Sequence, residues 1–306
     1  MNHTYYFCVA GLAFSVNLPA AWSVSHLLPS FWAFRSECLP ADLLFSFSAS
    51  CHALPCKGEV GRMISEDVND MGHVRLYATG DGYRVLFSYG EEVGGCHVME
   101  CDRLFTRAEA CINPDTPLAG VALTSMLRLL YSQAIVQAGG LSVHASCVVL
   151  NDCAYLFLGK SGTGKSTHAR LWMQIFEGSS LLNDDNPVIR WQDGCAVVYG
   201  TPWSGKTPCY KNDGYPVGGM VRLVQAGVNH FNRLASTDAF IALLPSCSVI
   251  HQDARLQDFM CRTLITLTGH VRIGCLKCRP DTASARLCAK ALGVLSPASP
   301  LDTVTL

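Results

Sequence analysis

One stretch of the sequence, residues 156–167, constrains the fold more than any other. It reads Leu-Phe-Leu-Gly-Lys-Ser-Gly-Thr-Gly-Lys-Ser-Thr, and Gly159, Gly164, Lys165 and Ser166 complete the pattern G-x-x-x-x-G-K-[ST] of a phosphate-binding loop. Glycines allow the tight turn in which backbone N–H groups point at phosphate oxygens. The pattern therefore predicts a loop that opens a helix, because a helix N-terminus favours bound anions.

The residues on both sides of this loop support the prediction. Residues 154–158 form an apolar run that predicts a buried strand, and residues 167–176 carry apolar side chains at helical spacing. In such a loop Lys165 reaches the β- and γ-phosphates, and the Ser166 hydroxyl binds Mg²⁺. The alternative is a glycine-rich turn that matches the pattern by chance. The predicted nucleotide-binding residues of the loop are Gly159, Lys160, Ser161, Gly162, Thr163, Gly164, Lys165, Ser166 and Thr167.

The composition limits what the rest of the chain can be. Of its 306 residues, 49% are hydrophobic and only 15% are charged, which allows a large core and argues against global disorder. The net charge of −1 gives no electrostatic footprint for nucleic acid or for a membrane surface. The 16 cysteines follow no repeating spacing, as is typical of reduced thiols, and no Lys or Arg precedes Arg35 in the apolar N-terminus. We therefore expect a cytoplasmic protein without a membrane span, and a homo-oligomer is compatible with the sequence.

Two regions of the chain differ in their pattern of elements. Residues 1–112 are β-rich, with strand-forming runs and a strong hairpin signal at residues 79–82. The turn cluster at residues 113–117 marks a junction, and the amphipathic helix expected after it ends at the glycines of positions 139–140. Strands and helices then alternate. We expect an α/β protein with a smaller β-rich domain over residues 1–112 and a phosphate-loop domain with a mixed sheet over residues 113–306.

Two adjacent carboxylates, Asp184 and Asp185, follow the phosphate loop after one helix and one short strand. In this position one carboxylate can bind Mg²⁺, and the other can accept a proton from an attacking hydroxyl. The alternative is an ordinary turn, because the run Asp-Asp-Asn-Pro has the composition of one. The phosphate loop directly upstream favours the functional interpretation. The spacing alone does not decide which carboxylate serves the metal and which is the base.

His144 and Lys206 are further candidate site residues, and for each there is also an explanation that involves no function. His144 lies inside a strand expected over residues 141–150, 21 positions before Lys165. It is either a core histidine or a group at the phosphate site. Lys206 lies in a loop rich in Gly, Pro and Ser, and it either reaches a phosphate or is a surface lysine.

Together these residues resemble the kinase domain of HPr kinase/phosphorylase and of the bacterial kinases related to it. Those kinases share the phosphoenolpyruvate carboxykinase-like nucleotide-binding fold. The resemblance runs from about residue 140 to residue 190, and more loosely to residue 292. It rests on His144 in the run Val-His-Ala, on the phosphate loop, and on the run Leu-Asn-Asp-Asp-Asn at residues 182–186. Three elements in this order are more specific than a phosphate loop alone.

The resemblance implies ATP and Mg²⁺ as cofactors and gives each candidate a role. Lys165 and His144 would contact the transferring phosphate. Ser166 and Asp184 would bind the metal, and Asp185 would be the base that activates a serine hydroxyl. The sequence also departs from the family. A downstream Glu-Ile-Arg-Gly-type signature is not visible, and the N-terminal region does not match, so HPr as the substrate and the reverse dephosphorylation are left in doubt.

The sequence thus predicts a phosphotransferase that uses ATP and Mg²⁺ to phosphorylate a hydroxyl. A serine of a protein or peptide is the expected acceptor, and a small hydroxyl compound is a further option. One alternative is a non-catalytic nucleotide sensor or scaffold with a kinase-like fold, and the joint presence of Lys165, Ser166 and the two aspartates argues against it. A GTP-dependent switch protein would need an Asn-Lys-x-Asp element, which the sequence lacks.

Overall fold

The computed structural model describes residues 1–52, 54, 61–69, 72–89, 96–205 and 207–294. The protein is of mixed α/β type and contains two mixed sheets. Contacts between residues divide the chain into two compact units, the first made of residues 1–139 with 248–259 and the second of residues 140–247 with the chain from 260 onward. The sequence-based boundary after residue 112 differs from this division, because the contacts group helix α2 (Ala119–Gln137) with the first unit.

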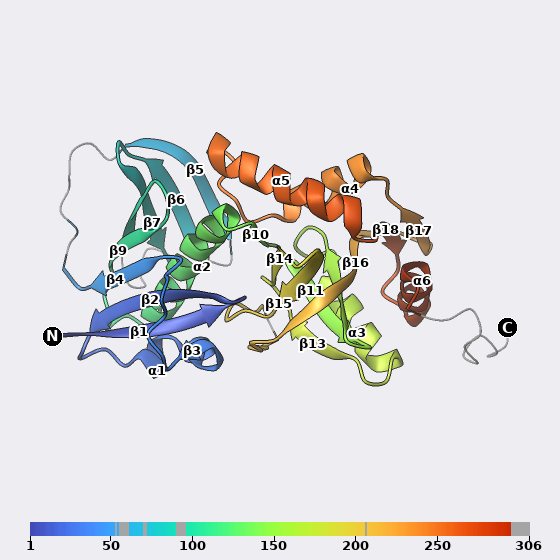
Figure 1. Ribbon diagram of the computed structural model, residues 1–306, viewed down its shortest axis with the longest axis horizontal. Helices are drawn as coiled ribbons and strands as arrows, with labels where there is room; N and C mark the ends of the chain where they lie inside the picture. Colours follow the sequence, from blue (N-terminus) through green and yellow to red (C-terminus); the bar gives the residue numbers. More distant parts are fainter. Residues whose placement is uncertain (53, 55–60, 70–71, 90–95, 206, 295–306) are drawn as a thin grey trace. The chain divides into compact units, whose positions relative to one another are not determined.

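The first unit is built on a nine-stranded sheet in the order β3-β1-β2-β4-β9-β8-β7-β6-β5 (Figure 1). Neighbouring strands are antiparallel except in the pairs β2–β4 and β4–β9. The hairpin predicted at residues 79–82 joins β6 to β7 and is confirmed. The strands are β1 (Asn2–Val9), β2 (Leu12–Pro19), β3 (Arg35–Ser36), β4 (Ser46–Ser50), β5 (Arg62–Asn69), β6 (Gly72–Ala78), β7 (Gly82–Ser88), β8 (Cys96–Asp102) and β9 (Arg107–Cys111), and the short helices are α1 (Val24–Leu27) and η1 (Pro29–Phe34).

Helix α2 packs on this sheet through an aromatic contact. The Tyr131 hydroxyl donates a hydrogen bond to the carbonyl of Val9 at 2.9 Å, and the Tyr131 ring centroid lies 5.8 Å from that of Phe14 and 6.4 Å from that of Phe45. By length and composition α2 is apolar enough to cross a membrane, and 72% of its most apolar window is buried inside the structure. An apolar helix that is mostly buried in this way is typical of a protein core.

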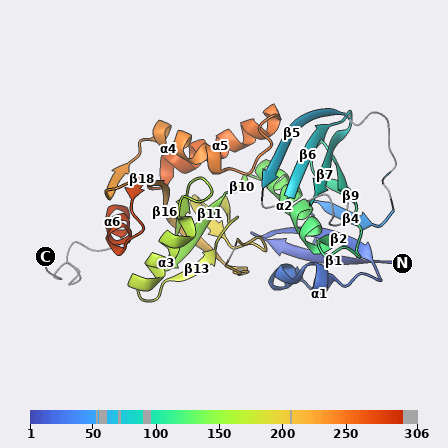
Figure 2. The same ribbon diagram turned by 180° about the vertical axis from the view of Figure 1, so that it is seen from behind.

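The second unit contains a sheet whose main layer has the order β13-β11-β12-β16-β18-β17 (Figures 1 and 2). Strands β12, β16 and β18 are parallel, whereas β11 is antiparallel to both of its neighbours. The start of β16 also pairs with β15 and so joins a second layer, β15-β14-β10. The strands are β10 (Gly140–Ser142), β11 (Ala145–Leu150), β12 (Cys153–Leu158), β13 (Ser180–Asn183), β14 (Val188–Gln192), β15 (Cys195–Tyr199), β16 (Gly214–Gln225), β17 (His230–Arg233) and β18 (Ile273–Cys278). The helices are α3 (Lys165–Ile175), α4 (Ser236–Leu243), η2 (Leu244–Ser246), α5 (Ala254–His270), which begins in the first unit, and α6 (Thr282–Leu292).

Helices α3 and α6 cover one face of the main layer and close an apolar core over it (Figure 2). Trp172 of α3 is fully buried in this core, with its ring centroid 5.0 Å from that of Tyr155 and 5.2 Å from that of Phe157, both on β12. Arg222 of β16 lies between two residues of that core along an extended strand, so its side chain points to the other face. There the Arg222 guanidinium donates to the carbonyl of Ala242 in α4 at 2.8 Å. The layer therefore carries helices on both faces.

The strand expected over residues 141–150 is two strands, and this expectation was wrong. β10 ends before Val143, which forms an isolated bridge with Cys247, and β11 begins after His144. The chain leaves one layer here and enters the other, since β10 pairs with β14 and β11 pairs with β12 and β13. An apolar run has the same pattern in either layer, so the sequence did not show the break. His144 consequently lies at a strand start and not inside a strand.

Candidate functional site

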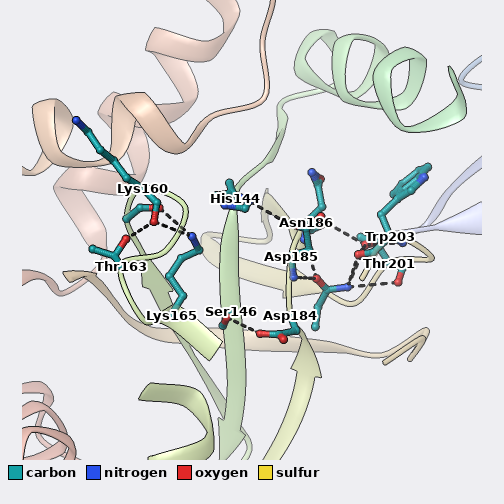
Figure 3. A network of polar contacts seen from close by, with 12 residues as sticks. His144, Ser146, Lys160, Thr163, Lys165, Asp184, Asp185, Asn186, Thr201 and Trp203 are labelled. Atoms are coloured by element: carbon teal, nitrogen blue, oxygen red, sulfur yellow. Dashed lines mark hydrogen bonds and ion pairs between the residues drawn. The ribbon is translucent and has the colours of Figure 1, made fainter. Parts of the chain in front are cut away.

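The topology of the second unit brings its candidate residues to one edge of the sheet. Strands β12, β16 and β18 are parallel and β13 runs in the same direction, so their carboxyl ends share that edge. Strand β11 runs the opposite way and begins there. The phosphate loop after β12, the two aspartates after β13, and His144 and Ser146 at the start of β11 therefore meet at one place (Figure 3). The structure brings together residues that lie tens of positions apart in the sequence.

The phosphate loop has the backbone geometry that its glycines predict. Gly159, Gly162 and Gly164 have φ angles of 151°, 78° and 101°, in the region that favours glycine. A Cβ atom on Gly159 would lie 2.8 Å from the Thr163 hydroxyl and 3.2 Å from the carbonyl oxygen of Leu223 on the neighbouring strand. Strand β12, the loop and helix α3 follow one another as the sequence predicted. The backbone N–H groups at the start of α3 are thus available to an anion.

Lys165 is buried at the first position of α3, with only 9% of its surface exposed. Its Nζ donates to the carbonyl oxygens of Gly159 at 3.0 Å and Lys160 at 3.2 Å, so the side chain folds back across the loop. Burial lowers the pKa of Lys165 below its usual value, and the negative charges of Asp185 and Asp184 oppose that shift. A buried cation that has lost hydration gains more from a bound anion than an exposed one does.

The two aspartates are buried in the turn after β13, with 6% of Asp184 and 7% of Asp185 exposed. The hydroxyl of Ser146, itself fully buried in β11, donates to Oδ1 of Asp184 at 2.6 Å. His144 Nδ1 lies 3.0 Å from Oδ1 of Asp185. The adjacent carboxylates therefore face different partners, and buried ionisable groups with specific partners are typical of functional sites.

Asn183 shapes the turn that carries the two aspartates. Its Oδ1 accepts hydrogen bonds from the backbone N–H groups of Asp185 at 3.0 Å and Asn186 at 2.8 Å. Its Nδ2 donates to the carbonyl oxygen of Trp203 at 3.0 Å and to the hydroxyl of Thr201 at 3.1 Å. Asn183 is fully buried, and its amide is hydrogen-bonded on both sides, as buried polar groups normally are. This one side chain joins the acidic turn to the loop after β15.

The loop after β15 passes directly beside the aspartates. A Cβ atom on Gly205 would lie 3.0 Å from the carbonyl oxygen of Asp184 and 3.5 Å from the Cβ of Asp185. Lys206, the next residue and a predicted phosphate contact, lies outside the described residues. Its role stays a prediction.

His144 is not a core histidine, because 38% of its side chain is exposed. Its backbone N–H donates to the carbonyl of Ser246 at 2.7 Å, which fixes the chain at the break between β10 and β11. Its ring lies between the phosphate loop and Asp185 in the view of Figure 3. A partly exposed imidazole in contact with a buried carboxylate can both orient that carboxylate and reach a ligand.

The other predicted loop residues lie around the same turn. Lys160 and Ser161 are exposed, and the Thr163 hydroxyl donates to the carbonyl of Lys160. Ser166 and Thr167 are half-buried in the first turn of α3. No group of three His, Cys, Asp or Glu side chains that could hold a metal ion occurs among the described residues. Mg²⁺ does not need such a cage, since it takes one or two carboxylates together with waters and phosphate oxygens.

Sequence reasoning missed three residues of the site, Ser146, Asn183 and Gly205. Ser146 lies two positions after His144, which places the two side chains on one face of an extended chain. Asn183 directly precedes the aspartates, and asparagine often bonds the backbone two residues ahead. These two signals were present in the sequence. The approach of Gly205 could not be inferred, because it depends on how a distant loop folds back.

Comparison with known proteins adds little to this description. No protein-family model matches the chain, and no curated protein sequence matches it. Among solved structures the chain is similar to the HPr(Ser) kinase/phosphatase from Coxiella burnetii, with 11% identity and a TM-score of 0.31, over 50% of this chain and 88% of that chain. A match this distant supports no inference about activity. What the site can do follows from its own residues.

Proposed function

We propose that the protein is a phosphotransferase that moves the γ-phosphoryl group of ATP, with Mg²⁺, to a hydroxyl acceptor. One observation carries the proposal. A glycine-rich loop with a buried lysine, two buried aspartates and a partly exposed histidine lie at the same edge of one sheet. This combination supplies an anion site, a base and a metal ligand within one site.

The proposed chemistry assigns a task to each of these side chains. The loop N–H groups and Lys165 hold the β- and γ-phosphates, and His144 contacts the phosphoryl group that moves. Asp185 accepts the proton of the acceptor hydroxyl as the hydroxyl oxygen attacks the γ-phosphorus. The bond from phosphorus to the β–γ bridging oxygen breaks, and ADP leaves with that electron pair. The partner of Asp185 suits this task, because Nδ1 of His144 lies 3.0 Å from Oδ1 of Asp185 and, when it carries a proton, can orient the carboxylate.

Asp184 and Ser166 are the residues that would hold Mg²⁺. Both supply hard oxygen ligands, and the Ser146 hydroxyl fixes one oxygen of Asp184. When bound, the ion supplies positive charge that offsets the charge on the phosphate oxygens. Because these two residues are too few to hold Mg²⁺ alone, we expect tight metal binding only together with nucleotide.

The same proposal includes the fold type, the acceptor, a further phosphate contact and the location in the cell. The order of His144, the phosphate loop and the paired aspartates supports a phosphate-loop domain of the phosphoenolpyruvate carboxykinase-like type. It also supports a protein or peptide serine as the acceptor. Lys206 is proposed as a further phosphate contact. The cytoplasm is the proposed location.

The direct test is transfer of label from γ-labelled ATP to an acceptor. Purified protein is incubated with Mg²⁺, labelled ATP and a lysate of its source, and labelled products are identified by mass spectrometry. We expect one dominant labelled product, which is absent with the Lys165→Ala variant. Nucleotide consumption that releases all of the label as inorganic phosphate would indicate a hydrolase. Binding of ATP without consumption would indicate a sensor or scaffold, and either result would overturn the proposal.

A further inference from the structure

A cavity of about 420 Å³ adjoins the phosphate loop, and neither Lys165 nor the two aspartates line it. Loop residues Gly162, Thr163 and Gly164 form one wall, and helix α3 continues that wall. The opposite wall comes from the chain after β16 and after β18. The cavity volume lies in the range of small-molecule sites, roughly 300–1,000 Å³. The cavity therefore shares a wall with the proposed phosphate site.

The sheet topology marks this place as a ligand site independently of the cavity. After β12 the chain passes through α3 to β13 on one side of the sheet, whereas after β16 it leads to β18 on the other side. Strands β12 and β16 are parallel neighbours, so the two connections diverge between them. Ligands of open α/β sheets bind in the crevice that such a divergence opens outside the carboxyl ends of the strands.

The lining of the cavity combines apolar surface with a few polar groups. Leu171, Leu223 and Pro280 provide apolar walls, while Gln225 and Arg279 provide an amide and a guanidinium. The Gln225 amide donates to the carbonyl of Gly162 at 3.1 Å, which fixes Gln225 against the loop and leaves its Oε1 to act as an acceptor. The Arg279 side chain is 61% exposed at the rim, and its planar guanidinium can stack on an aromatic ring. A flat, aromatic ligand with polar edges fits these groups.

We propose that this cavity binds the nucleoside part of the nucleoside triphosphate whose phosphates lie in the loop. The proposal rests on the phosphate site proposed above and adds the residues that recognise the base. The direction of the bound nucleotide follows. Thr163 lines the cavity and Lys165 does not, whereas the charges of Asp185 and Asp184 act on Lys165. The nucleoside therefore lies on the Thr163 side of the loop, and the γ-phosphate points to the aspartates.

The test compares binding of MgATP with binding of magnesium tripolyphosphate, which has the phosphates but no nucleoside. Calorimetry is done on the full chain and on Arg279→Ala, which removes the stacking group, and Ala226→Phe, which takes up cavity volume. Lys290→Ala is the matched control, because it removes a cation exposed on α6 that does not line the cavity. Circular dichroism checks that each variant is folded.

We expect the wild-type protein to bind MgATP at least tenfold more tightly than magnesium tripolyphosphate. Arg279→Ala should weaken MgATP binding about tenfold, as expected for the loss of one stacking partner. Arg279→Ala should change the affinity for tripolyphosphate less than twofold. Lys290→Ala should leave the affinities for both ligands unchanged. Equal wild-type affinities for the two ligands, or MgATP binding that neither cavity variant weakens, would overturn the nucleoside pocket and leave the phosphate site standing. Failure of both ligands to bind would overturn the phosphate site and the pocket together.

Discussion

At the scale of single residues, the site depends on uncharged neighbours that hold buried charges in place. A buried carboxylate is costly unless hydrogen bonds replace its lost hydration. Ser146 supplies such a bond to Asp184, and Asn183 fixes the backbone that carries Asp184 and Asp185. These neighbours do no chemistry themselves, yet they decide where the chemical groups lie.

Asn183 offers the sharpest stability test of this view. Asn183→Ala removes the partners of two buried N–H groups and leaves the Thr201 and Trp203 contacts unmade. Each unsatisfied buried group costs roughly 1–3 kcal/mol, so we expect the free energy of unfolding to fall by about 3 kcal/mol. Chemical denaturation measures this change.

Asn183→Asp is the matched variant, because aspartate keeps the acceptor oxygen and loses the donor. We expect it to retain the backbone bonds to Asp185 and Asn186 while it loses the bonds to the loop after β15. A loss below about 0.5 kcal/mol for Asn183→Ala, the usual range for a surface change, would show that Asn183 does not hold the turn.

His168 predicts a pH dependence of stability. It is buried on α3, where its Nε2 accepts a hydrogen bond from Trp172 at 3.2 Å, and burial lowers its pKa from 6.5 to about 4. Below pH 6.5 the unfolded chain binds a proton that the folded chain does not, so acid favours unfolding. The free energy of unfolding should therefore fall as the pH drops from 6.5 through 4, by up to about 3 kcal/mol from this residue.

His168→Gln separates this effect from other titrating groups, because glutamine accepts a hydrogen bond but does not titrate in this range. We expect the variant to lose less stability than the wild type between pH 6.5 and pH 4. Identical pH profiles would mean that His168 is accessible to protons in the folded state.

The sequence was sufficient to predict those site residues that lie together in a contiguous motif. The phosphate loop and the paired aspartates are each contiguous, so the sequence shows them directly. Ser146 needs Asp184 to acquire a role, and the two are 38 positions apart. The pairing of the strands decides which serine contacts which aspartate. That pairing cannot be read from a single sequence.

At the scale of elements, the turn residues at positions 79–82 predicted the hairpin between β6 and β7 correctly. Asn151 and Asp152 both have positive φ angles between β11 and β12, as expected for the two-residue turn of a hairpin. Asp281 caps α6 by accepting a hydrogen bond from the backbone N–H of Ser284, and aspartate is among the preferred residues at this position. Helix α4 has no such cap, because Ala235 occupies the N-cap position and makes no side-chain hydrogen bond. Serine is a preferred N-cap residue, but Ser236 lies one position too late and is already inside the helix.

The phosphate loop predicts a difference between two glycine substitutions. Gly159→Ala places a methyl group against the Thr163 hydroxyl and the Leu223 carbonyl at a φ of 151°, so the loop must move. Such strain costs of order 1–3 kcal/mol. We expect MgATP binding to weaken at least tenfold in calorimetry while the protein stays folded.

Gly178→Ala is the control for this prediction. Gly178 also has a positive φ, of 78°, but a side chain there meets open space and lies beyond the end of α3. We expect it to lower stability and leave nucleotide affinity within twofold of the wild type. Equal effects of the two substitutions on affinity would indicate that the loop conformation does not matter for binding.

At the scale of the whole molecule, the sequence and the structure place the boundary between the units differently. The change of pattern near residue 113 is visible in the sequence, whereas the grouping of α2 with the first sheet is not. Tyr131 of α2 contacts Val9, Phe14 and Phe45, which lie at least 86 positions earlier in the chain. An amphipathic pattern shows that a helix buries one face, and it does not show against which sheet.

A protease site engineered into residues 113–117 tests the two boundaries. If the unit boundary lay there, the cleaved pieces would separate as two folded domains. Because α2 packs on the first sheet, we expect the pieces to elute together in size-exclusion chromatography after complete cleavage. Separation into two monodisperse, folded fragments would contradict the grouping of α2 with the first unit.

The central claim is that the edge of the second sheet transfers phosphate with different roles for its two aspartates. It is tested most directly by single-turnover transfer from γ-labelled ATP as a function of Mg²⁺ concentration, with Asp184→Asn and Asp185→Asn beside the wild type. We predict that Asp184→Asn raises the Mg²⁺ requirement. Asp185→Asn should bind MgATP as the wild type does and transfer about 10²–10⁴-fold more slowly, as expected for the loss of a general base. Transfer at the wild-type rate and Mg²⁺ requirement by both variants would contradict the claim.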